Sequence, residues 1–130
     1  MGSRTAATIL TSLLVLALCW QMVVLAGLVP LEMVWGGRLQ NEDERRIMTI
    51  VSMAILPLMI VIVLASIGTL GRRWMNAGRL GAWLMFALFC LNTVGNLIAE
   101  DPRERWIFTP ITLLLAFLSW RVTKQPVQHP

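Results

Sequence analysis

The placement of acidic residues constrains this chain more than any other feature. All seven fall in two short segments, residues 32–44 and 100–104. The windows without any charged side chain are residues 5–31, 47–71, 80–99 and 106–120. A membrane-spanning helix needs about 20 apolar residues, within a range of roughly 17–25. Three windows reach that length. The fourth is shorter, but Arg105 and Arg121 flank it and can extend toward the interfaces.

Composition supports the same conclusion. Charged residues make up 14% of the chain, whereas a soluble domain carries roughly 25%. The sequence therefore predicts an all-α polytopic membrane protein, an up-down bundle of four transmembrane helices forming a single domain over residues 1–130. The expected helices cover about residues 5–30, 42–70, 80–99 and 102–122.

Two of these helices carry start signals. Asn41 is a good N-cap, and Glu44 follows three residues later, as in a capping box. Asp101 is the second expected N-cap, with Pro102 at the first helical position and Glu104 in the first turn. Acids in a first turn are favoured by the helix dipole.

Lys and Arg predict the orientation. The acid-free side of the expected bundle carries Arg4, Arg72, Arg73, Arg79, Arg121 and Lys124. The other side has five cations among the acids: Arg38, Arg45, Arg46, Arg103 and Arg105. This bias places both termini in the cytoplasm, with the bacterial inner membrane as the expected location. Membrane lipids with anionic headgroups are the natural partners. Nucleic acid is not expected, because no basic stripe with interleaved aromatics is present.

A polar line stands out late in the third expected helix. Asn92, Asn96 and Glu100 are spaced i, i+4 and i+8 and should share one face. Because amides exposed to lipid are costly, this face is expected to point into the bundle interior or a cavity. Gln21 in the first helix falls at a similar depth. Gly95 and Ala99 form a small-xxx-small pair that would let a neighbouring helix approach closely.

The candidate ligand-binding residues near the acidic side are Gln21, Glu32, Trp35, Arg38, Asn92, Asn96 and Glu100. They could line a polar pocket open to the outside, or the amides could hold the helices together by hydrogen bonds. Glu32 and Glu100 sit near helix C-termini, where the dipole disfavours negative charge. Ion pairs with Arg38 and with Arg103 or Arg105 explain them, and a catalytic pair of carboxylates is the alternative.

Residues that would carry a metal or cofactor are missing from the spans. The single histidine, His129, lies in the C-terminal tail, and neither cysteine belongs to a CxxC pair. No metal site and no cofactor are therefore expected, and no catalytic residue is assigned.

The segments Val34-Trp35-Gly36-Gly37-Arg38-Leu39 and Asn92-Thr93-Val94-Gly95-Asn96-Leu97 resemble a group of small bacterial four-helix integral membrane proteins of unknown function. The resemblance extends over about residues 30–120 in motif order and helix count. It implies the architecture and brings no activity or ligand with it.

The leading expectation is a small integral membrane protein without enzymatic activity. It would bind a lipid-like ligand or a partner membrane protein at its outward-facing polar end, or assemble with copies of itself. One alternative is a small membrane enzyme acting on a lipid or isoprenoid, with Glu32 or Glu100 as acid/base. The other is a homodimeric small-molecule transporter.

Overall fold

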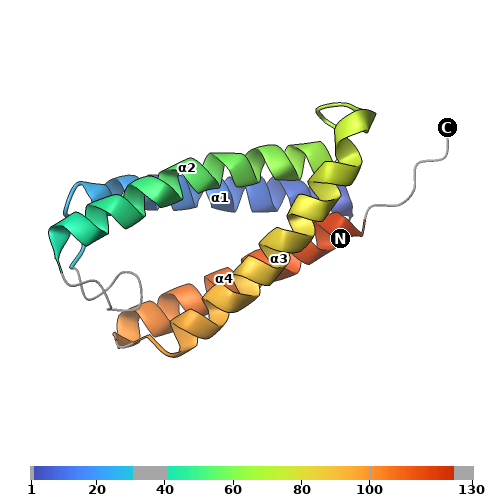
Figure 1. Ribbon diagram of the computed structural model, residues 1–130. Coiled ribbons are helices and arrows are strands. Elements are labelled where there is room, and N and C mark those ends of the chain that lie inside the picture. Colours follow the sequence, from blue (N-terminus) through green and yellow to red (C-terminus); the bar gives the residue numbers. More distant parts are fainter. Residues whose placement is uncertain (1, 31–40, 100, 125–130) are drawn as a thin grey trace.

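The protein is a bundle of four long helices. A computed structural model describes residues 2–30, 41–99 and 101–124. The helices are α1 (Ser3–Leu25), α2 (Glu42–Ser66), α3 (Met75–Leu97) and α4 (Pro102–Thr123), with a short 3-10 helix η3 (Arg72–Trp74) before α3 (Figure 1). No strand occurs in these ranges, and the predicted all-α class is confirmed.

The helices pack in a closed ring. α1 lies beside α2 and α3 beside α4 (Figure 1), α2 also packs on α3, and α4 packs back on α1. The Ser3 hydroxyl donates a 3.5 Å hydrogen bond to the carbonyl oxygen of Lys124. The start of α1 and the end of α4 therefore meet at one end of the bundle, as an even number of spans requires.

The core occupies a narrow seam between the helices. Its most completely buried side chains include Ala6, Leu10, Leu14, Val63, Ala82, Leu118 and Val122. Large apolar side chains on the outside remain exposed, among them Leu16, Leu58, Leu84, Leu91 and Leu113. A soluble protein avoids such a surface, whereas lipid tails solvate it.

Two helices end earlier than their hydropathy predicts. α1 stops at Leu25 instead of residue 30, and α2 at Ser66 instead of residue 70. In each case a glycine with positive φ follows the C-cap: Gly27 at +81° and Gly68 at +85°. Apolar residues continue beyond both glycines, so hydropathy alone overestimates the helices. Gly27 and Gly68 adopt the left-handed conformation that commonly terminates a helix.

α3 begins at Met75, five residues before the expected start. The first turns of α3 contain Arg79, whose charge marks the end of the apolar window but does not end the helix. Gly78 allows this part of α3 to approach α2 closely, since a Cβ there would lie 2.4 Å from the backbone nitrogen of Ser66. No other helix of this bundle approaches Gly95 closely, since a Cβ there would meet nothing within 4 Å.

Both predicted N-caps are confirmed. The Asn41 side chain accepts a 2.9 Å hydrogen bond from the Glu44 backbone N–H. The Asp101 side chain accepts a 2.8 Å bond from the Arg103 backbone N–H. Each bond satisfies one of the free N–H groups at a helix start.

The two capped helices share a sequence pattern sixty positions apart (101 − 41). Four residues are identical in the two helices: Glu44 and Glu104, Arg45 and Arg105, Ile47 and Ile107, and Thr49 and Thr109. Ser52 corresponds to Thr112. The shared residues other than the isoleucines are buried or half-buried in both helices. The starts of α2 and α4 therefore share one pattern, and the two helices run in the same direction in the bundle (Figure 1).

Candidate functional site

A polar cluster joins α3 to α4 in the half of the bundle where α2 and α4 begin. Asn96 Nδ2 donates a 3.2 Å hydrogen bond to Thr112 Oγ1. Thr93 Oγ1 lies 3.1 Å from the same oxygen, and the Thr112 hydroxyl donates to the Phe108 carbonyl at 2.9 Å. The half-buried Asn96 amide thus has a partner on the neighbouring helix. For Asn96, this contact agrees with the predicted hydrogen bonding between helices.

Asn92 differs from Asn96 in its exposure. Its side chain is exposed, whereas that of Asn96 is half-buried. Each step of four residues advances about 40° around a helix of 3.6 residues per turn. A line spaced i, i+4, i+8 therefore winds around the helix, and Asn96 lies against α4 while Asn92 is exposed.

The surface around Asn92 is apolar. The neighbouring side chains Leu88 and Leu91 are 39% and 69% exposed. Asn92 is five residues before the last residue of α3, about 7.5 Å at a rise of 1.5 Å per residue. Gly95 lies one turn away, with open space where its side chain would be. α3 thus has an amide next to a glycine on a surface that is otherwise apolar.

Gln21 contributes to the interior from α1. It is half-buried, and its Oε1 atom is buried without a hydrogen-bond partner among the described residues. Thr49 on α2 is fully buried, and its hydroxyl is likewise unpartnered within the described ranges. The first hairpin therefore also brings polar groups into the bundle, but among the described residues no hydrogen bond joins Gln21 to Asn92 or Asn96.

Four sequence-predicted site residues, Glu32, Trp35, Arg38 and Glu100, lie outside the described residues. The two cations considered as partners of Glu100 have other contacts. Arg103 forms an ion pair with Asp101 at 2.8 Å, and Arg105 Nη2 donates a 2.8 Å hydrogen bond to the Ala99 carbonyl. The hydrogen bond from Arg103 holds the pKa of the Asp101 carboxyl below its ordinary value of 3.8.

The sequence interpretation missed the role of Arg45. This side chain is only 7% exposed, donates a 2.8 Å hydrogen bond to the Val29 carbonyl and pairs with Glu42. Thr112, the acceptor for Asn96, was missed as well. The pattern shared by α2 and α4, sixty positions apart, points to both residues, because it aligns Arg45 with Arg105 and Thr112 with Ser52.

The residues described hold no group of three or more His, Cys, Asp or Glu side chains that could bind a metal ion. The helices α1, α2, η3 with α3, and α4 are each long and apolar enough to cross a membrane. Together with the exposed apolar surface, they define a multi-pass helical membrane protein. No protein-family model, curated protein or solved structure matches the chain.

Proposed function

We propose that this protein is a non-enzymatic membrane protein that binds a partner membrane protein through the part of α3 that carries Asn92. The observation that carries the proposal is the exposed amide of Asn92 on an otherwise apolar surface. An amide without hydrogen bonds in an apolar medium costs roughly 2–7 kcal/mol. A neighbouring helix that offers hydrogen-bonding groups at this depth would remove that cost.

The chemistry of the partner follows from Asn92 and Gly95. The amide has two N–H donors and one acceptor oxygen, so it fits a helix carrying Asn, Gln, Ser or Thr at the same depth. Small residues let transmembrane helices approach closely, and Gly95 leaves such space beside Asn92. A second copy of this chain satisfies the same requirement, since one Asn92 amide can both donate to and accept from another.

The other functions are less well supported by the described residues. A lipid-like ligand in an interior polar pocket would compete with the contact between Asn96 and Thr112. An enzyme would need the Asn96 amide to be free for a substrate, but this amide donates to Thr112 on α4. A homodimeric transporter is consistent with two hairpins that run in the same direction. Such a transporter would require a dimer, which α3 could form.

We place the protein in the bacterial inner membrane, with both termini in the cytoplasm. The six cations on the acid-free side support this orientation. The bacterial location follows the resemblance of the Trp35–Leu39 and Asn92–Leu97 segments to small four-helix bacterial proteins. In this orientation Asn92 lies in the outer half of the membrane.

Native mass spectrometry of the tagged full-length chain, extracted from bacterial membranes in mild detergent, tests the proposal. The wild-type protein should carry a second copy or a defined partner. Asn92→Leu should lower that complex about five- to thirtyfold, since hydrogen bonds between membrane helices contribute roughly 1–2 kcal/mol in model peptides. Asn76→Leu is the matched control, because Asn76 is exposed at the opposite end of α3.

Two results would count against partner binding. One is a wild-type monomer that carries only lipid, which would favour lipid-like ligand binding. The other is a complex that Asn92→Leu and Asn76→Leu affect equally, which would remove the α3 face from the interaction.

A further inference from the structure

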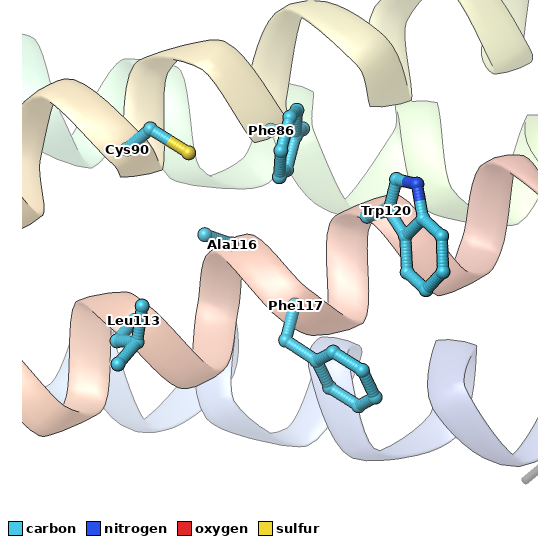
Figure 2. A pocket seen from close by; sticks show the side chains of 6 residues that line it. All are labelled: Phe86, Cys90, Leu113, Ala116, Phe117 and Trp120. Atoms are coloured by element: carbon cyan, nitrogen blue, oxygen red, sulfur yellow. The ribbon is translucent and has the colours of Figure 1, made fainter.

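A lipid-facing groove runs between α3 and α4, away from the Asn92 face. Its volume is about 510 Å³, and its lining consists of Phe86, Cys90, Leu113, Ala116, Phe117 and Trp120 (Figure 2). Phe86 and Cys90 come from α3, and the other four residues come from α4. The volume is within the roughly 300–1,000 Å³ typical of ligand sites. In a bilayer such an open apolar groove is filled by a hydrocarbon chain or by another protein.

The groove leads to a single lysine. Trp120 lines the groove and also lies under the Lys124 ammonium, whose Nζ atom is 5.6 Å from the Trp120 ring centroid. The same atom is 5.2 Å from the Trp83 ring centroid. The two rings therefore hold the ammonium next to the groove. From Leu113 to Lys124 the distance along α4 is roughly 16 Å at 1.5 Å per residue.

The charges around Lys124 favour an anion. Lys124 forms no ion pair with a carboxylate within the described ranges. The acids lie in the segments 32–44 and 100–104, and the described ones precede or start α2 and α4, at the opposite end of the bundle. Basic residues at a membrane surface attract anionic headgroups, and tryptophan is enriched at the same level.

We propose that this groove is a binding site for an anionic phospholipid. One acyl chain lies along Phe86, Cys90 and Leu113, and the headgroup phosphate accepts hydrogen bonds from the Lys124 ammonium. The apolar walls bind the chain of any phospholipid, and Lys124 selects for negative charge. The site is separate from the proposed partner face at Asn92.

Native mass spectrometry with added lipid tests the selectivity. At equal concentration and with identical acyl chains, phosphatidylglycerol should bind more than phosphatidylcholine. Lys124→Gln should lower phosphatidylglycerol binding about fivefold, the effect expected for one basic residue at a membrane surface. Arg73→Gln removes the same charge at the same end of the bundle but away from the groove, where Arg73 stacks on Trp74, and should change binding little.

Cys90 and Cys19 allow a test of the acyl-chain position without any substitution. Both thiols are free and exposed, but only Cys90 lines the groove. Phosphatidylglycerol should slow the labelling of Cys90 by a membrane-permeant maleimide several-fold and leave Cys19 unchanged. Inorganic phosphate, which has no acyl chain, should protect neither thiol.

A large side chain that fills the groove provides an independent test of lipid binding. Cys90→Trp should reduce binding of both lipids, whereas Cys19→Trp should not. Equal binding of the two lipids, or equal protection of Cys19 and Cys90, would overturn the site. Loss of the protein complex in Cys90→Trp with lipid binding unchanged would instead make the groove a protein contact. Asn92→Leu should keep its lipid, so failure of the partner proposal would not affect this one.

Discussion

Nη1 of Arg45 lies 2.8 Å from the carbonyl oxygen of Val29 and donates a hydrogen bond to it. This contact joins the first turns of α2 to the segment that follows α1. Gly27 lies against the same guanidinium, since a Cβ at that position would be 3.3 Å from Arg45 Nη2. In the second hairpin Arg105 donates to the Ala99 carbonyl at the same distance. Each hairpin is thus closed by an arginine one turn after its N-cap.

Removing the Arg45 guanidinium should destabilise the bundle. Hydrogen bonds to charged groups contribute roughly 1.5–3 kcal/mol, and Arg45→Gln would lose both this bond and the pairing with Glu42. We expect the free energy of unfolding to fall by about 2 kcal/mol in SDS titrations followed by tryptophan fluorescence. Arg46→Gln is the control, because Arg46 is exposed. Equal losses in both variants would show that the contact with Val29 is unimportant.

Glycines on α3 should respond in opposite directions to alanine. Gly78→Ala places a Cβ 2.4 Å from the Ser66 nitrogen, and overpacking of this kind costs roughly 1–3 kcal/mol. Gly95→Ala meets nothing within 4 Å and should stabilise the monomer by up to about 1 kcal/mol through helix propensity. The same SDS titration measures both. A neutral Gly78→Ala would mean that α2 and α3 can separate without loss.

The contact between Asn96 and Thr112 should appear as coupling in a double-mutant cycle. Hydrogen bonds between membrane helices average about 0.6 kcal/mol in such cycles. Asn96→Leu and Thr112→Val should therefore destabilise the bundle by less in combination than the sum of the single changes. Additive losses would show that the 3.2 Å contact contributes no measurable energy.

Acid should weaken the start of α4. Asp101 has a pKa below 3.8 in the folded protein because Arg103 hydrogen-bonds to it. A carboxyl whose pKa is lowered by folding stabilises the protein fully above its unfolded pKa. That contribution is lost as the pH falls below 3.8 through the folded pKa. Asp101→Asn and Arg103→Gln should both reduce this acid-dependent loss in fluorescence-monitored titrations, whereas Arg4→Gln at the far end should not.

The architecture could be predicted from the sequence because a lipid bilayer restricts which segments can cross it. Charge-free windows of helical length must cross the membrane, and Asn41 and Asp101 cap the helices that follow the acidic segments. Helix ends were less predictable. The apolar residues beyond Gly27 and Gly68 satisfy the same hydropathy, and only the backbone conformation of these glycines shows where the helices stop.

The candidate site was harder to predict than the fold, because it depends on helix rotation. Asn92 and Asn96 share a line in sequence, yet Asn92 is exposed while Asn96 is half-buried and bonded to Thr112. Hydropathy gives the depth of a residue but not the direction it faces. The pattern shared by the starts of α2 and α4 indicates which side chains face the interior, since buried Thr49 aligns with half-buried Thr109.

The meeting of Ser3 and Lys124 has a consequence for chain order. Because α4 packs on α1 and the two hairpins run in the same direction, the bundle has no architectural reason to begin with α1. A circular permutant that starts at η3 and joins the end of α4 to the start of α1 by a short linker would present the hairpins in the opposite order. It should insert with the same number of spans and both new ends on the original side.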